Sequence, residues 1–105
     1  MINQNLPPVR VTLVHAPACH FCEDAEQALG ELGERYTIEV RAVDIDSPEG
    51  RSLVATHRPA MNPLVLVDGA YFSSGRLPRK KLAKALEQRD AEARAAVAAA
   101  TQVRC

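Results

Sequence analysis

The sequence predicts one α/β domain whose elements follow the order strand, helix, strand, helix, strand, strand, helix. Three observations predict this fold. Short runs rich in β-branched and apolar residues are typical of strands, and they occupy residues 9–15, 36–42 and 64–67. Segments with helical patterns separate these runs, as in parallel strands joined through a helix. The dipeptide Asp68-Gly69 follows the third run and predicts a hairpin to a fourth strand.

The composition is that of an ordinary globular domain of 105 residues, with 47% hydrophobic and 25% charged residues. The formal net charge is zero and tryptophan is absent, so neither a basic face nor stacking platforms indicate nucleic-acid binding. No apolar run reaches membrane-spanning length, and the first residues lack the pattern of a signal peptide. We therefore expect a cytoplasmic protein that binds neither nucleic acid nor membrane. A monomer is the expected state, and dimerisation through the Ala-rich C-terminal segment is the alternative.

Residues 9–15 predict a central strand, because apolar side chains on both faces indicate burial on both sides. A helical pattern then begins at Cys19 or His20 and ends at Gly33, a plausible C-terminal stop. The apolar stripe of this helix comprises Phe21, Ala25, Ala28, Leu29 and Leu32.

Residues 36–42 alternate strictly between apolar and polar side chains, which predicts a half-buried strand near a sheet edge. From Val43 onward the apolar parity changes, which predicts a bulge or a change of exposure. Ser47 as cap and Pro48 in the first turn predict a short helix to about His57.

The fourth strand is predicted at residues 70–73, and a last helix begins after Pro78 with Leu82 and Leu86 on its buried face. The segment that follows is rich in alanine and has little apolar surface to bury. The predicted organisation is a flexible arm at residues 1–8, a domain at residues 9–90, and an Ala-rich helical extension or tail at residues 91–105.

Four basic residues cluster where the last helix begins, namely Arg76, Arg79, Lys80 and Lys81. Cations are unfavourable at this end of a helix dipole. Two interpretations stay open: a positive rim that attracts an anionic thiol or an acidic partner, and a solvated face.

The segment Pro17-Ala18-Cys19-His20-Phe21-Cys22 lies between the first strand and the first helix. A cysteine at a helix N-terminus has a pKa of roughly 3.5 to 7.5, against about 8.5 for a free thiol, and the thiolate is the nucleophile in disulfide exchange. Cys19 has that position, so we predict that it is the nucleophile and that Cys22, one turn later, is the resolving thiol. The adjacent His20 adds positive charge when protonated and is predicted to tune Cys19.

The same cysteine spacing also occurs in zinc sites and in domains without redox turnover. A zinc site needs four ligands, usually in two separated pairs. The remaining candidates are His15, His20, His57 and Cys105, and none is paired at zinc spacing, so no metal site is predicted. A C-x-x-C between a strand and an amphipathic helix of a cytosolic chain favours redox chemistry. A non-catalytic binding module and a metal-binding protein stay open as alternatives.

These residues resemble those of glutaredoxin-like proteins in the thioredoxin-fold superfamily. The chain resembles in particular the short bacterial glutaredoxin-like family, whose active sites read C-H-x-C followed by an acidic helix start. The matching segments are residues 17–24, 43–46 and 62–69. The resemblance covers about residues 9–89 and implies a thioredoxin/glutaredoxin fold, βαβαββα, with a four-stranded mixed sheet flanked by three helices.

The resemblance also implies that Pro63 is the cis-proline of the fold and that Asn62 faces the dithiol. By the same resemblance, the substrate site contains Pro17, Phe21, Asn62, Pro63, Ser74 and Gly75. Glutathione-dependent members carry Lys, Tyr and Thr-Val where this chain has Ala16, Phe21 and Met61-Asn62. Glutathione is therefore not the expected partner.

The predicted function is that of a cytoplasmic thiol–disulfide oxidoreductase, acting in cell redox homeostasis and electron transport through the redox-active pair Cys19–Cys22. No bound cofactor is expected. The expected partners are a protein or small-molecule disulfide substrate and a thiol or flavoprotein reductant. A low-molecular-weight thiol is an alternative co-substrate.

Overall fold

The computed structural model describes residues 8–103, with side chains described to residue 96. Its elements are β1 (Val9–His15), α1 (His20–Leu32), β2 (Ile38–Asp44), α2 (Pro48–His57), β3 (Leu64–Val67), β4 (Ala70–Ser74) and α3 (Arg79–Val103). This order confirms the predicted βαβαββα fold. Residues 1–7 of the predicted arm and Cys105 lie outside the described residues.

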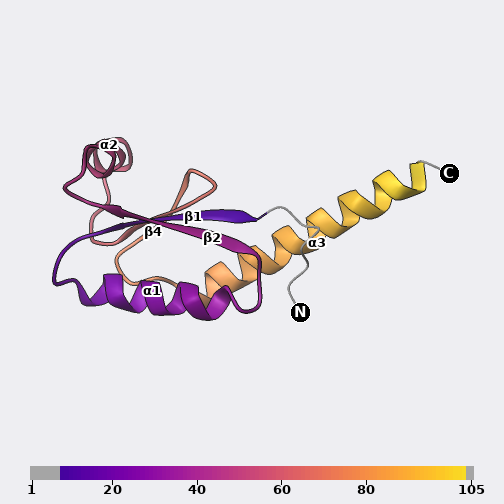
Figure 1. The fold of residues 1–105 in the computed structure, drawn as a ribbon, viewed down its shortest axis with the longest axis horizontal. Coiled ribbons are helices and arrows are strands. Elements are labelled where there is room, and N and C mark those ends of the chain that lie inside the picture. The colour runs from indigo at the N-terminus through magenta and orange to yellow at the C-terminus, as the bar shows by residue number, and fades with distance from the viewer. Residues whose placement is uncertain (1–7, 104–105) are drawn as a thin grey trace.

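The four strands form one mixed sheet in the order β2-β1-β3-β4. β1 pairs in parallel with β2 and antiparallel with β3, and β3 pairs antiparallel with β4. β1 is therefore central, as predicted, and β2 is an edge strand. Figure 1 shows α1 and the start of α3 on one face of this sheet and α2 on the other.

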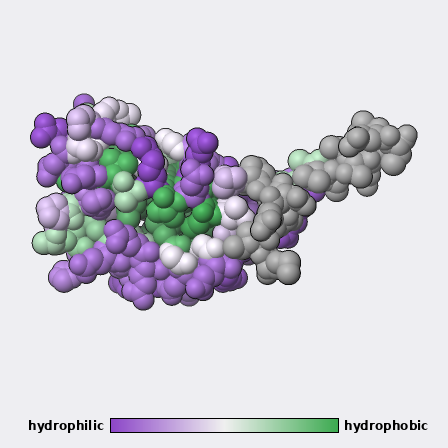
Figure 2. Space-filling view, viewed as in Figure 1, coloured by the Kyte–Doolittle hydropathy of each residue, from purple (hydrophilic) through white to green (hydrophobic). Residues whose placement is uncertain are grey.

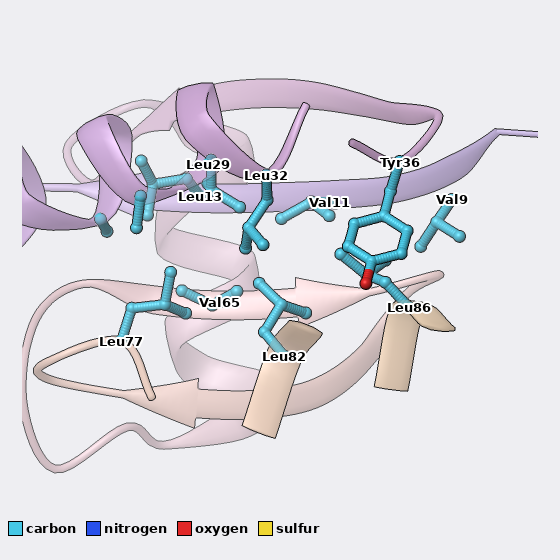
Figure 3. Close-up of a cluster of buried hydrophobic side chains, with 12 residues drawn as sticks. Val9, Val11, Leu13, Leu29, Leu32, Tyr36, Val65, Leu77, Leu82 and Leu86 are labelled. Carbon is cyan, nitrogen blue, oxygen red and sulfur yellow. The ribbon is translucent and has the colours of Figure 1, made fainter. Parts of the chain in front are cut away.

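The main core lies between the sheet and the helices α1 and α3. Figure 3 shows Val11 and Leu13 of β1 in this layer, facing Leu29 of α1 and Leu82 of α3. Tyr36 precedes β2 and is buried in the same cluster. Burial of these side chains supplies most of the stabilisation, at about 25 cal/mol for each Å² of apolar surface removed from water.

A smaller core lies under α2. Val14 and Val43, on neighbouring strands, pack there with Leu64 and Leu66 of β3. Ser47 caps α2 as predicted, because its Oγ accepts a hydrogen bond from the Gly50 backbone N–H at 3.0 Å. α2 thus covers the end of the sheet at which β1 and β2 finish.

One prediction about β2, its first residue, needs correction, and the two alternatives left open at Val43 are resolved. The strand begins at Ile38 rather than Tyr36, because the Tyr36 backbone N–H still bonds to the carbonyl oxygen of Leu32 at the end of α1. The parity change at Val43 is a change of exposure and not a bulge, since the register with β1 runs unbroken to His15 and Asp44. The bulge of this sheet lies instead between β3 and β4, at Val65/Leu66.

The hairpin turn is tied to two other elements. Asp68 and Gly69 both have positive φ, 50° and 83°, as the predicted Asp-Gly turn requires. The backbone N–H of Arg10 donates to Asp68 Oδ1 at 3.0 Å, and the Asp68 N–H donates to the Arg10 carbonyl at 2.7 Å. The Asp68 carboxylate also pairs with Arg89 of α3. The turn therefore joins the start of β1 to the last helix.

The last helix continues well past the core. Leu82 and Leu86 are fully buried, whereas most of residues 91–96 are exposed, and the helix runs on to Val103. Figure 1 shows this part of α3 extending away from the sheet. Across residues 8–103, no helix has both the length and the apolarity that crossing a bilayer demands.

Candidate functional site

The two cysteines of the C-x-x-C segment are joined as a disulfide at the start of α1. Cys19 is the N-cap residue of the helix, with extended backbone, and the Cα atoms of Cys19 and Cys22 lie 5.2 Å apart. The Cys22 backbone N–H donates to Cys19 Sγ at 3.2 Å. The predicted helix start is thus confirmed, and the Cys19 sulfur occupies the position where unpaired N–H groups favour negative charge.

The two cysteines differ in exposure. Cys22 is only 4% exposed and lies on the buried face of α1, whereas Cys19 is partly exposed. In disulfide exchange, the attacking thiolate must reach one sulfur of the S–S bond that it breaks. A partner can therefore reach Cys19 more readily than Cys22, which fits the order predicted from the sequence.

Phe21 is placed differently from its predicted position in the apolar stripe. Its side chain is 37% exposed, and Cys22 takes its place on the buried face with Ala25. Pro17, in the turn before Cys19, is also exposed. Ala18 has a φ of +51°, in the left-handed region that is uncommon for a residue with a side chain. The sequence has no glycine at this position to indicate the left-handed backbone.

The His20 side chain projects into solvent. It is 99% exposed, and its Nδ1 lies 4.0 Å from a carboxylate oxygen of Glu23. An exposed charge acts on its neighbours through high-dielectric solvent, so an influence of His20 on Cys19 would be modest and sensitive to salt.

The second part of the site begins at the start of β3. The peptide bond between Asn62 and Pro63 is cis, which confirms the expectation from the family resemblance. Val14, next to the end of β1, pairs with Leu64, so the register places Pro63 at the sheet end where β1 runs into the cysteine loop. Asn62 is exposed at this end, whereas Pro63 is buried.

Gly75 is held against the cis-proline. Its backbone N–H donates to the Pro63 carbonyl at 3.0 Å. Its φ is +83°, and a Cβ at this position would lie 3.3 Å from both Cβ and Sδ of Met61. The structure thus brings Pro63 and Gly75 together and adds Met61, which is 53% exposed and which the sequence analysis left out of the site. The sequence feature that could have indicated a role for Met61 in the site is its position directly before Asn62.

Ser74, the neighbour of Gly75, is half-buried and its Oγ lies 3.1 Å from the Tyr71 hydroxyl.

The basic cluster at the start of α3 does not form a continuous rim of unpaired cations. Arg79 donates to Asp24 Oδ1 at 2.7 Å and to Glu31 Oε1 at 3.0 Å, both on α1. Lys81 lies over the Phe72 ring, with its Nζ 5.4 Å from the ring centroid. Arg79 therefore adds no unpaired charge to this cluster, because two carboxylates of α1 bind it. Attraction of an anionic thiol or an acidic partner to the cluster stays a prediction.

Potential metal ligands among residues 8–103 do not form a cluster. In the part of the chain that is described, no three His, Cys, Asp or Glu side chains lie close enough together to hold a metal ion. Cys22 is joined to Cys19, and His20 points into solvent. Cys105, one of the candidate ligands, is outside the described residues.

Comparison with known protein families identifies a match that covers most of this chain. A family model described as Glutaredoxin-like domain (DUF836) matches residues 10–87, which include every predicted site residue and all of the four strands except Val9, the first residue of β1. No curated protein matches the chain.

Proposed function

Because the chain belongs to the Glutaredoxin-like domain (DUF836) family, we propose that it is a thiol–disulfide oxidoreductase that works through Cys19 and Cys22. The observation that carries the proposal is the unequal disulfide at the start of α1. One sulfur is partly exposed and receives a helix N–H, and the other is buried one turn later. A structural staple has no need of that asymmetry, whereas an exchange reaction does.

The proposed reaction has two exchange steps. The Cys19 thiolate attacks one sulfur of a substrate disulfide, so that a Cys19–substrate disulfide forms and the other substrate sulfur leaves as a thiolate. Cys22 then loses its proton and attacks Cys19 Sγ, which forms the Cys19–Cys22 disulfide and releases the second substrate thiol. Two electrons pass to the substrate, and a thiol or flavoprotein reductant then supplies two electrons that reduce the Cys19–Cys22 disulfide again. Run in reverse, the same steps oxidise a substrate dithiol.

The remaining site residues receive supporting roles in this proposal. Pro63 and the exposed Asn62 present the substrate chain, beside Gly75 and Ser74, and the exposed Phe21 and Pro17 contact it from the side of the cysteine loop. His20 tunes Cys19 through its charge.

The reaction is proposed for a reducing compartment such as the cytoplasm, because thiol reductants there regenerate the dithiol. Glutathione is not the proposed reductant, since Ala16, Phe21 and Met61 replace the side chains that glutathione-dependent members use.

A redox titration tests the couple directly. The protein is equilibrated at a series of thiol–disulfide poises, alkylated, and analysed by mass spectrometry for the Cys19–Cys22 pair. We expect a reversible two-electron transition between roughly −270 and −120 mV, the range of known dithiol catalysts. A pair that never oxidises, or that a bound metal protects from alkylation, would overturn the proposed enzymatic function. The result would then favour a non-catalytic binding module or a metal-binding protein.

Trapping variants test the roles of the two cysteines. Cys22→Ser should accumulate a mixed disulfide with a substrate, because nothing can resolve it, whereas Cys19→Ser should not. Each variant is incubated with a disulfide-bonded protein substrate and examined on a non-reducing gel. Equal trapping by both variants would contradict the assigned roles.

A further inference from the structure

The outer edge of β2 has its backbone groups directed away from the sheet. The Val9 N–H bonds to the Thr37 carbonyl, and the Ile45 N–H bonds to the His15 carbonyl. In a strand, the N–H and C=O of one residue point to the same side, and successive residues alternate. Odd-numbered residues of β2 therefore face β1, so Ile38, Val40 and Ala42 direct their N–H and C=O outward. No strand within residues 8–103 pairs with that edge.

The side chains along this edge separate by chemistry. Ile38, Val40 and Ala42 lie on the face that carries α1, and Val40 is 44% exposed. Figure 2 shows hydrophobic surface in the middle of the molecule, between hydrophilic regions that follow α1 and α2. Glu39 and Arg41 are exposed on the opposite face, where Arg41 also pairs with Glu49 of α2. One face of the edge is thus apolar and the other carries one charge of each sign.

We propose that this edge binds the same edge of a second copy, in an antiparallel β2–β2 pair whose two-fold axis passes through Val40. In this register Val40 lies opposite Val40 of the partner subunit, and Ile38 lies opposite Ala42 of the partner subunit. All three residues have outward backbone groups, so each meets a partner that can form ladder hydrogen bonds. The two sheets then form one continuous sheet across an isologous interface.

Charge selects this register over its neighbours. With the two-fold at Val40, Glu39 lies opposite Arg41 of the partner subunit, and symmetry produces the same pair again. A two-fold at Glu39 or at Arg41 would place identical charges directly opposite one another, which is destabilising. Glu39 and Arg41 would also occupy the closer, non-hydrogen-bonded positions of the ladder, where side chains approach most. The strand is therefore complementary to itself in hydrogen bonding, in apolar surface and in charge.

This inference does not depend on the redox proposal, because it concerns the strand edge and not the cysteines. It also differs from the monomer expected from the sequence. The first test measures the molar mass of the full chain by sedimentation over a concentration series, under reducing conditions. We expect a reversible monomer–dimer equilibrium. A monomer at every concentration up to the solubility limit would overturn the proposal.

Charge variants test the register. Glu39→Arg places arginines opposite one another twice and should raise the dimer dissociation constant about tenfold. Combining Glu39→Arg with Arg41→Glu and Glu49→Arg reverses every charge while restoring each pair, and should recover the wild-type constant. Glu49→Gln is the matched control, because it removes the partner of Arg41 within the subunit and leaves the proposed pair intact. Failure of the reversed variant to recover dimerisation would rule out this register.

Cross-linking gives a readout independent of charge. In a full-length background with Ser at positions 19, 22 and 105, Val40→Cys places two thiols across the axis, with Cα atoms about 5.5 Å apart and within disulfide range. Mild oxidation should therefore yield a covalent dimer. Ile38→Cys alone and Ala42→Cys alone should form no covalent dimer, and their mixture should cross-link. Circular dichroism of each variant verifies folding. Cross-linking of Ala42→Cys alone, or none with folded Val40→Cys, would overturn the proposed axis.

Discussion

The backbone N–H of Cys22 donates a hydrogen bond to the sulfur of Cys19 across 3.2 Å, within the first turn of α1. Cys22, which is proposed to resolve the mixed disulfide, therefore also directs its backbone N–H toward the sulfur of Cys19, the proposed nucleophile. Since the Cys22 side chain is buried against the core, that N–H is held in place by helix packing. Folding of α1 thus positions both sulfurs before any substrate arrives.

The first prediction concerns the reactivity of the reduced protein. Iodoacetamide should modify Cys19 well before Cys22, because Cys19 is partly exposed at the helix N-terminus and Cys22 is 4% exposed. Peptide mass spectrometry of samples quenched over time measures the two rates. Denatured protein is the control, in which the two rates should converge. Equal rates in the folded protein would contradict the proposed asymmetry.

The second prediction concerns Arg79, which joins α3 to two carboxylates of α1. Arg79→Ala should lower the free energy of unfolding by about 1 kcal/mol, because two partly exposed ion pairs of modest strength are lost. Urea unfolding measures the change, and high salt should reduce it. Lys80→Ala, at the next position, is the matched control. In a double-mutant cycle with Asp24→Asn, a coupling energy near zero would show that the observed contact does not contribute to stability.

The third prediction concerns pH and the pair formed by Arg41 and Glu49. The pKa of the Glu49 carboxyl lies below its usual value, chiefly because the Arg41 guanidinium donates hydrogen bonds to it and also through charge attraction. A carboxylate with a lowered folded-state pKa stabilises the fold above its unfolded-state pKa of about 4.3. That stabilisation is lost as pH falls through the folded-state value. Wild type should therefore be more stable than Glu49→Gln at neutral pH, and urea unfolding at several pH values should show the difference vanish in acid. A difference that is independent of pH would contradict this origin.

The fourth prediction compares two glycines that both lie in helices. Gly30→Ala in α1 should stabilise the protein by roughly 0.5–1 kcal/mol, because alanine is the better helix former and a Cβ there has no neighbour within 4 Å. Gly50→Ala in α2 should destabilise it severely, because the added Cβ would lie 2.1 Å from the Asp44 carbonyl oxygen. Thermal unfolding of both variants measures the opposite signs. Similar effects at the two positions would show that close approach of α2 to Asp44 is not what requires Gly50.

Much of the fold could be predicted because its local signals agree with its long-range order. Ser47-Pro48 indicated the start of α2, and Asp68-Gly69 indicated the hairpin, and both have the expected local geometry. Cys19 could be placed at the helix N-terminus because a strand and Pro17 precede it. These signals lie within a few residues of the features that they specify.

The features that could not be predicted are of two kinds. Some are contacts between residues far apart in the chain, and others depend on which of two similar neighbouring residues is buried. Phe21 and Cys22 both lie at helical spacing from Ala25, and hydrophobicity alone selected the wrong one for burial. Arg79 and Asp24 are 55 positions apart in the chain, so no local pattern links them. The self-complementary edge of β2 becomes visible only once the backbone groups that face β1 are known.

The direction of α3 has a practical consequence for building a sensor from this protein. α1 begins, with Cys19, at one end of the molecule, and α3 runs toward the other (Figure 1). At 1.5 Å per residue, the 25 residues of α3 span about 37 Å. A fluorophore attached to the last turns of α3 would therefore not block access to the disulfide.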